Sequence, residues 1–268
     1  IPKDYIDSEK PYSNWGIDLQ RPDVYALHCD IHQNGEQTDH HHSVKLMTQK
    51  IIELADITSG DNVLDAGCGT GSLLFEASEG HPEANFFGIN ISTNQLESAK
   101  KYLRTTKINN AVLSFQDYLY TAFPESFFDK IISSERAAHS QNKLALFLES
   151  RRTIKAGGTI VISDAFLNMY PKQKSDDETL VRDAQEGWVL PPIPTIENLV
   201  ETLTQAGFGD INTKDITVNI LPSTFIMAAN AAVRLRESGE AGEKLLKSRK
   251  ACVAADKLMR NGILSYFW

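Results

Sequence analysis

Three glycines occur within five positions of the segment VLDAGCGTGS, residues 63–72. An apolar run precedes them, so the segment is predicted to be the loop that follows a buried strand. Gly67, Gly69 and Gly71 let the backbone adopt positive φ and approach a ligand closely, and the N-terminus of a following helix favours an anionic group. A nicotinamide-dinucleotide fingerprint needs glycine at position 72, where this chain has Ser72. The loop therefore indicates a cofactor other than a dinucleotide; the alternative is an ordinary glycine turn.

A second group of reactive side chains lies in SSERAAH, residues 133–139. Glu135 and His139 stand four residues apart, a spacing at which two side chains share a face of a helical turn. Carboxylates and imidazoles are common proton-transfer groups in enzymes, so this segment is a candidate catalytic site. The alternative is that Ser134 and Glu135 only cap the helix that follows.

No set of side chains is spaced to hold a metal ion. His40, His41 and His42 are consecutive, and three consecutive side chains cannot all face one ion without strain. The acidic run 176–178 is predicted to start a helix, where carboxylates favour the helix dipole. Cys68 has no basic partner nearby in the sequence and is expected to pack as a small residue. We therefore expect neither a metal centre nor a cysteine nucleophile.

Strand-like apolar runs alternate with helical periodicity along the chain. Such alternation predicts a parallel sheet with helices on both faces, in which ligands bind beyond the carboxyl ends of the strands. The glycine loop and Glu135 both follow predicted strands, so they are expected at this edge. The predicted strands cover residues 62–66, 85–91, 130–133, 159–163, 211–220 and 263–268. The predicted helices cover residues 43–54, 72–78, 94–104, 141–154 and 196–206, with further helix from about 223 to 260.

Two regions stand outside this alternation. Residues 1–45 are rich in Tyr, Trp and His and are expected to form an N-terminal lid on a main domain of residues 46–268. Residues 166–195 mix helix formers, prolines and aromatic side chains after a strand end, where α/β enzymes often carry substrate-binding segments. We expect a substrate cap there, with Met169, Tyr170 and Trp188 lining a mostly apolar pocket.

Charge and composition narrow the range of partners. The formal net charge is −8 and no block of Lys and Arg occurs, which argues against nucleic acid and favours a small-molecule substrate. Three widely separated cysteines form neither a disulfide framework nor a zinc pair, so a reducing, cytoplasmic location is expected. Without an apolar run of about 18 residues, stable membrane insertion is not expected. The sequence leaves open whether the chain forms a homo-oligomer. We also expect a few terminal residues to lie outside this sequence.

Together these motifs resemble the class I S-adenosylmethionine-dependent methyltransferases. Their first motif, a strand ending in Asp/Glu-x-Gly-x-Gly-x-Gly, is matched by Asp65–Gly71, and the family order continues through residues 115–118, 127–134 and 154–162. The segment NFFGINISTNQ, residues 85–95, looks like the second strand of the subgroup that contains cyclopropane fatty acid synthases, tocopherol methyltransferases and terpenoid C-methyltransferases. The resemblance implies a Rossmann-like, mostly parallel sheet of seven strands and S-adenosyl-L-methionine as the cofactor.

The resemblance also implies which residues bind this cofactor. Asn90 and Gln95 would meet the ribose hydroxyls, and Asp117 would meet the adenine amino group. The aromatic rings of Tyr12 and Trp15 would face the sulfonium, unless they only pin the N-terminal segment. With their neighbours, the implied cofactor-binding residues are Tyr12, Trp15, Asp65, Gly67, Cys68, Gly69, Gly71, Asn90, Ile91, Gln95, Asp117, Tyr118 and Ser134.

Methyl transfer to a small organic acceptor of specialised metabolism is the reaction that the resemblance implies. A lid suits this reaction, because the protein mainly aligns the acceptor with an activated methyl group and excludes water. C-methylation of an isoprenoid or another alkene is the first expectation: Glu135 would stabilise positive charge and take up a proton, with His139 orienting it or serving as the base. O- or N-methylation remains an alternative, as does cyclisation by an enzyme that binds the cofactor without methyl transfer.

Overall fold

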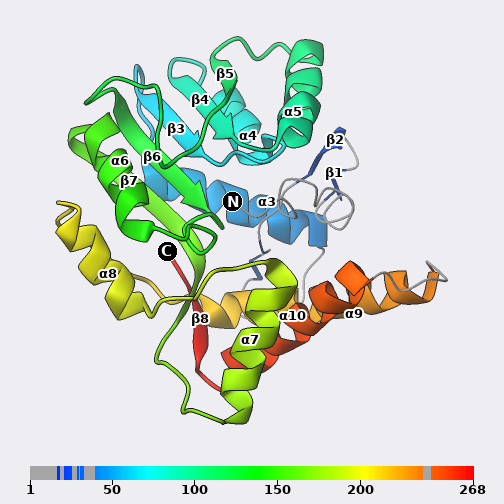
Figure 1. Ribbon diagram of the computed structural model, residues 1–268. Coiled ribbons are helices and arrows are strands. Elements are labelled where there is room, and N and C mark those ends of the chain that lie inside the picture. Colours follow the sequence, from blue (N-terminus) through cyan, green and yellow to red (C-terminus); the bar gives the residue numbers. More distant parts are fainter. Residues whose placement is uncertain (1–16, 19–20, 26–28, 30, 33–39, 238–242) are drawn as a thin grey trace.

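The computed structural model describes residues 17–18, 21–25, 29, 31–32, 40–237 and 243–268. Its centre is a six-stranded sheet in the order β5–β4–β3–β6–β7–β8 (Figure 1). The strands are β3 (Asn62–Ala66), β4 (Asn85–Asn90), β5 (Ala111–Phe115), β6 (Phe128–Ser134), β7 (Ile154–Leu167) and β8 (Leu264–Phe267). Neighbours among β3 to β7 run parallel, and β8 lies antiparallel to β7. The predicted α/β fold with a mostly parallel sheet is confirmed.

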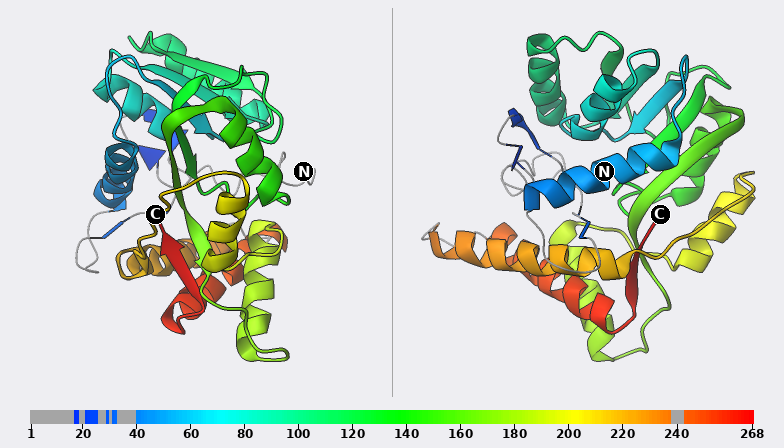
Figure 2. Two further views of the ribbon diagram at one scale, coloured as in Figure 1. Left: turned by 90° about the vertical axis from the view of Figure 1, so that its left-hand side faces the viewer. Right: turned by 180° about the vertical axis from the view of Figure 1, so that it is seen from behind.

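Helices cover both faces of the sheet because consecutive buried residues of a strand point to opposite sides. Val63 and Ile132 belong to a core cluster that α3, α4 and α5 close on one face. Their neighbours Leu64 and Ile131 belong to a cluster on the other face, where α6 and α8 also pack. Figure 2 shows the sheet edge-on in its left view, with α3 on one side and α6 and α8 on the other. These helices are α3 (His40–Ala55), α4 (Ser72–Gly80), α5 (Thr93–Thr105), α6 (Lys143–Thr153) and α8 (Ile196–Gln205).

Three further helices lie beside β8: α10 (Glu243–Arg260) packs against both α7 (Asp176–Trp188) and α9 (Thr217–Glu237). They form the lower group in Figure 1. A Cβ added at Gly187 of α7 would lie only 2.2 Å from the carbonyl oxygen of Lys247 on α10. Glycine therefore lets the two helices touch. A small antiparallel pair, β1 (Ile17–Asp18) and β2 (Arg21–Tyr25), contacts α5. In the described ranges, no helix is long and apolar enough to cross a membrane.

The strand predicted at residues 211–220 is not formed, and the sheet of the described residues has six strands, not the seven that the resemblance implies. This segment makes a single isolated β-bridge, between Asp215 and Phe267. α9 begins at Thr217, whose N–H donates to the Asp215 carboxylate at 2.8 Å. Asp215 thus satisfies a donor at the start of a helix, as a capping residue does. The apolar run continues into this helix, and the prediction of a strand as far as Ile220 is wrong.

Candidate functional site

The glycine loop joins β3 to α4. Gly67, Gly69 and Gly71 all have positive φ, at 94°, 56° and 90°, a conformation that glycine adopts without steric cost. A Cβ at Gly71 would lie 2.5 Å from the ring of Phe75, so the space there also excludes a side chain. The Gly67 N–H donates to the carbonyl of Ile89 at 2.9 Å, which ties the loop to β4.

Asp65 lies buried at the end of β3, beside this loop. Burial raises the pKa of its carboxyl group from 3.8 to about 7, and the positive charge of Arg136 opposes that rise. Arg136 follows β6, and its Nε donates to the carbonyl oxygen of Gly67 at 2.6 Å. The ends of β3 and β6 are therefore joined through the first glycine of the loop.

Cys68 is a packing residue of the loop. Burial raises the pKa of its thiol well above the ordinary value, and the neighbouring Asp65 raises it further. The thiol therefore stays protonated at neutral pH and is a poor nucleophile. Cys29, Cys68 and Cys252 are all free, in line with the predicted absence of a disulfide framework.

Two amide side chains meet at the end of β4. The Nδ2 of Asn90 donates to Gln95 Oε1 at 2.8 Å and to the Gly69 carbonyl at 3.2 Å. Ser92 caps α5 by accepting the N–H of Gln95 at 3.3 Å. Ile91, between these residues, is half-buried. Because each amide carries both donors and acceptors, the pair is suited to bind hydroxyl groups.

The remaining implied cofactor residues follow the neighbouring strands. Asp117 and Tyr118 lie just after β5, where the Asp117 carboxylate accepts the N–H of Leu119 at 2.9 Å. Ser134 ends β6, and its buried hydroxyl has no hydrogen-bond partner within the described residues. The structure thus brings the implied residues to the carboxyl ends of four adjacent strands, β5, β4, β3 and β6. Tyr12 and Trp15 lie outside the described residues.

Glu135 is the first residue after β6 and has a left-handed backbone, with φ at 50°. Non-glycine residues rarely adopt this conformation, and they cluster at functional sites when they do. Its N–H donates to the Ser163 carbonyl at 2.8 Å, which fixes the backbone. Its Oε1 accepts the Cys29 N–H at 2.6 Å and the Tyr266 hydroxyl at 2.9 Å. Two donors from distant parts of the chain therefore fix the orientation of the carboxylate.

A second acid, Asp164, lies beside Glu135. Burial raises its pKa from 3.8 to about 7, and the charge of Glu135 raises it as well. Its two oxygens accept the N–H groups of Ala138 and Ala165, both at 2.9 Å. His139 is also buried, which lowers its pKa from 6.5 to about 3, with the charges of Arg136 and Lys143 acting in the same direction. His139 is therefore neutral at physiological pH.

Residues 135–142 form a bend and a turn before α6, which begins at Lys143. The side chain of Asn142 caps this helix by accepting the Ala145 N–H at 2.9 Å. The alternative that Ser134 and Glu135 cap the following helix is therefore wrong. The helical turn that was expected to carry Glu135 and His139 on one face is likewise absent.

The turn nevertheless brings Glu135 and His139 to one cavity, of about 100 Å³. Asp164 and Tyr266 also line it. Gln95 and Arg136 reach it from the ends of β4 and β6, at the carboxyl edge of the sheet. The remaining wall is largely apolar and comes from α7, α9, α10 and their flanks: Trp188, Leu190, Ile193, Met227, Met259 and Leu264. The cavity therefore has acids at one end and an apolar chamber beside them.

Of the three expected acceptor residues, Trp188 lines this cavity. Met169 and Tyr170 do not line it, and they are 59% and 62% exposed. The Tyr170 hydroxyl donates instead to Asn198 of α8 at 2.9 Å. The two residues follow β7 on a surface turn, so they do not share a chamber with Trp188.

The acidic run 176–178 forms the first turn of α7, as predicted, and Ser175 caps that helix. In the part of the chain that the structure describes, no three His, Cys, Asp or Glu side chains come together as a metal site. Arg136, Asp164 and Tyr266 lie in the site but were not predicted from the sequence. Asp164 directly follows the predicted strand 159–163, so the strand-end rule could have identified it.

Residues 57–216 match a protein family described as a methyltransferase domain. The O-methyltransferase cnsE of Penicillium expansum is 31% identical to this chain, over 75% of this chain and 70% of its own length. A sterol 24-C-methyltransferase of Pneumocystis carinii is 28% identical, over 63% of this chain and 45% of its own length. A 2-methyl-6-phytyl-1,4-hydroquinone methyltransferase of Synechocystis is 29% identical, over 63% of this chain and 54% of its own length.

Solved structures share the fold over nearly the whole chain. The mycolic acid cyclopropane synthase CmaA1 matches with a TM-score of 0.83 at 15% identity, over 99% of this chain and 96% of that one. The geranyl diphosphate C-methyltransferase of Streptomyces coelicolor matches with a TM-score of 0.74 at 18% identity, over 98% of this chain and 95% of that one. The [4+2]-cyclase SpnF matches with a TM-score of 0.76 at 19% identity, over 90% of this chain and 85% of that one. Since the family match spans more than half of its residues, this chain belongs to the methyltransferase family.

Proposed function

We propose that this enzyme transfers a methyl group from S-adenosyl-L-methionine to a small, mostly apolar acceptor held beside Glu135. One observation carries the proposal. Gln95 and Arg136, at the cofactor-binding edge, line the same cavity as Glu135 and His139. The methyl donor and the acceptor would therefore meet at the carboxyl end of β6.

The carboxyl edge of the sheet fits this cofactor. The three glycines of the loop leave its backbone open to close approach, and the amides of Asn90 and Gln95 can bind the two ribose hydroxyls. Asp117, one strand further, would accept from the adenine amino group. Bound S-adenosyl-L-methionine supplies an already activated methyl group. The task of this chain is then to align the acceptor and exclude water, which can be worth about 7–11 kcal/mol.

We propose that the N-terminal segment acts as the lid of this site. The Cys29 N–H donates to Glu135, and Cys29 itself lines the cavity. His32 is buried, and its N–H and carbonyl both bond to Asn219 of α9, at 2.9 and 2.8 Å. Cys29 and His32 are thereby attached to the end of β6 and to α9.

C-methylation of an isoprenoid or another alkene is our first proposal for the reaction. Adding a methyl group to an alkene generates positive charge on carbon and then requires loss of a proton. A fixed carboxylate serves both needs, and Glu135 is held by Cys29 and Tyr266 in the cavity. Trp188 and the methionines of α9 and α10 would contact the apolar acceptor. The sterol C-methyltransferase relative is consistent with this reaction.

O-methylation of a hydroxylated natural product is the second candidate. It is favoured by the relative cnsE, an O-methyltransferase that matches three quarters of this chain. Glu135 would then accept the hydroxyl proton. His139 is a poor base in either reaction, because its pKa of about 3 leaves little affinity for a proton at neutral pH.

Product mass distinguishes these candidates. The chain is incubated with S-adenosyl-L-methionine and, separately, with isoprenoid diphosphates, phenols and amines. We expect one class to gain the mass of a CH₂ group, and fragmentation shows whether carbon, oxygen or nitrogen carries it. Conversion of an acceptor without a gain in mass would instead identify a cyclase and contradict methyl transfer.

A further inference from the structure

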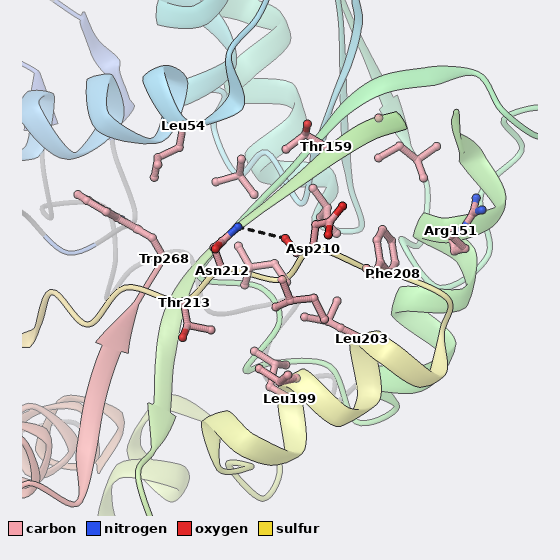
Figure 3. A pocket seen from close by; sticks show the side chains of 18 of the residues that line it. Leu54, Arg151, Thr159, Leu199, Leu203, Phe208, Asp210, Asn212, Thr213 and Trp268 are labelled. Carbon is pink, nitrogen blue, oxygen red and sulfur yellow. Dashed lines mark hydrogen bonds between the residues drawn. The ribbon is translucent and has the colours of Figure 1, made fainter. Parts of the chain in front are cut away.

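Two hollows along the sheet differ in the acids that line them. The larger, of about 780 Å³, lies between the first half of β7 and α8, with Leu199 and Leu203 on one wall (Figure 3). Among the described residues that line it, Asp210 is the one acid, and it is exposed. The cavity of the proposed acceptor site instead brings two acids together, Glu135 and Asp164. This pair can select a ligand by its hydrogen-bonding groups.

Each acid of the pair keeps one hydrogen-bonding position open. Oε1 of Glu135 accepts from Cys29 and Tyr266, whereas its Oε2 accepts no hydrogen bond from the described residues. Asp164 is only 4% exposed, and each of its oxygens accepts a backbone N–H at 2.9 Å. Asp164 accepts both of these bonds, so in its protonated form its O–H is still to be donated. The cavity therefore offers a ligand one acceptor and one donor, side by side.

The surroundings of Asp164 favour its protonated form. Burial raises its pKa from 3.8 to about 7, and the charge of Glu135 acts in the same direction. The two backbone N–H groups and the ammonium group of Lys143, at the start of α6, oppose the rise. A carboxylic acid that burial keeps neutral can donate a hydrogen bond to a ligand.

Other titratable groups line the same cavity. His139, in the turn after β6, has a pKa of about 3, and burial raises the pKa of the Tyr266 hydroxyl on β8 well above its ordinary value. Arg136 carries a guanidinium, and Cys29 adds a thiol from the N-terminal segment. His139 and Tyr266 are therefore neutral around pH 7, where Asp164 changes from a donor to an acceptor.

We propose that Asp164 orients the methyl acceptor by donating a hydrogen bond to an oxygen next to the atom that is methylated. The inference rests on the proposed function and narrows its substrate class. Glu135 takes the proton of the reacting group, and Asp164 keeps its own proton throughout. The acceptor is then a neutral compound with two neighbouring polar positions, such as a phenol with a second oxygen beside its hydroxyl. For C-methylation, the site selects an alkene whose carbon bears oxygen, as in an enol.

A hydrocarbon alkene would leave the donor of Asp164 buried and unpaired, which is unfavourable. A site built to bond a ligand oxygen therefore discriminates against the analogue that lacks it. This gives Asp164 a role in specificity that is separate from the role of Glu135 as a base.

Two phenols of nearly equal shape test this role by binding alone. 2-Methoxyphenol offers a hydroxyl to Glu135 and an ether oxygen to Asp164, and 2-ethylphenol has a CH₂ group in place of that oxygen. Calorimetry with the full chain at pH 6 should show about tenfold tighter binding of 2-methoxyphenol. At pH 8.5 this ratio should fall to about one or below, because Asp164 then no longer donates.

Variants of Asp164 separate hydrogen bonding from packing. Asp164→Asn keeps a donor that does not titrate, so its preference for 2-methoxyphenol should persist at both pH values. Asp164→Leu has no donor and should bind the two phenols equally at both. Should Asp164→Leu fail to fold, the comparison of Asp164→Asn with the wild type decides.

A wild-type ratio of one at pH 6, or a ratio that is the same at pH 6 and 8.5, would overturn the proposal. A ratio that falls with pH in Asp164→Asn would overturn it as well, because another group would then be responsible. Failure of both phenols to bind at millimolar concentration would refute the substrate class. Binding needs no methyl transfer, so these results stand apart from the proposed function. If the ratio behaves as expected but no acceptor gains a methyl group, only the reaction is wrong.

Discussion

Glu135 combines a rare backbone conformation with two fixed hydrogen bonds at the end of β6. If it stabilises charge and accepts the proton, Glu135→Gln should lower kcat by about 10²–10⁴-fold, because the amide is nearly isosteric but is not a base. Affinity for S-adenosyl-L-methionine, measured by calorimetry, should stay constant. Release of S-adenosylhomocysteine with the true acceptor measures the rate.

Tyr266→Phe is the matched control for this variant. It removes one donor to the carboxylate but keeps the carboxylate itself. Losing one such hydrogen bond is worth about 1–1.5 kcal/mol, so we expect a loss of about tenfold. If Glu135→Gln keeps at least half of the kcat, or loses no more than Tyr266→Phe, Glu135 is a structural residue only.

Gly69 tests the placement of the cofactor. Its φ is 56°, and its carbonyl accepts from Asn90. Gly69→Val should nearly abolish binding of S-adenosyl-L-methionine, because a β-branched side chain would fill the approach to the loop and strain its backbone. Gly60→Val is the control: Gly60 also has positive φ, at 84°, but open space around it. Unchanged affinity in a folded Gly69→Val variant would refute the placement.

At the scale of elements, α7 contributes both to the packing of the helices beside β8 and to the wall of the cavity. Its Gly187 allows contact with α10, and the next residue, Trp188, lines the cavity. Trp188→Ala should raise the acceptor KM by about tenfold or more, or change acceptor preference, by enlarging an apolar pocket. Cofactor affinity should hardly change.

Tyr170→Ala provides the comparison, because Tyr170 lies in the same segment, residues 166–195, but outside the cavity. Its acceptor KM should match that of the wild type. Equal KM for Trp188→Ala with every acceptor would count against α7 as a wall of the acceptor site. Urea unfolding of both variants separates a loss of folding from a loss of contact.

Elements governed by local signals were predictable. β3 coincides with the apolar run 62–66, and α8 begins at Ile196 after the capping Thr195. The predicted strand 211–220 failed because a helix begins at Thr217, where the Asp215 carboxylate accepts the first N–H, although the start of this helix also reads as apolar and β-branched. Residue propensities cannot distinguish a strand from a helix in such a run. The hydrogen bond from the Thr217 N–H to Asp215 marks the start of the helix.

The same distinction applies to the site. Residues at the carboxyl end of a strand, such as Asp65 and Asn90, were predictable because parallel strands end at one edge. Cys29 and Tyr266 were not, because they reach Glu135 across 106 and 131 positions of the chain. Contacts at such separations depend on the packing of α9 and α10 and leave no local pattern.

At the scale of the whole molecule, two buried acids make stability depend on pH. Asp65 and Asp164 have ordinary pKa values of 3.8, raised to about 7 in the folded chain. Between these values the unfolded acid has lost its proton while the folded acid keeps it. Each acid therefore contributes stability that is fully present below pH 3.8 and is lost as pH rises through about 7.

Asp164→Asn removes one of these titrations. The free energy of unfolding of the variant, relative to the wild type, should increase from pH 4 to pH 7 by up to about 1.4 kcal/mol per pH unit. The loss of one acceptor for the Ala138 or Ala165 N–H lowers stability equally at every pH. Urea unfolding at several pH values measures this difference. A difference that stays constant with pH would show that Asp164 is ionised in the folded protein.

Methyl transfer to an acceptor beside Glu135 is the central claim, and the stoichiometry of a single reaction tests it. The chain is given S-adenosyl-L-methionine with a deuterated methyl group together with an acceptor identified by product mass. Mass spectrometry then counts the labelled product and the S-adenosylhomocysteine formed. The account predicts one labelled methyl group in the product for each S-adenosylhomocysteine. Turnover of the acceptor with no label in the product, or S-adenosylhomocysteine formed without methylated product, would contradict it.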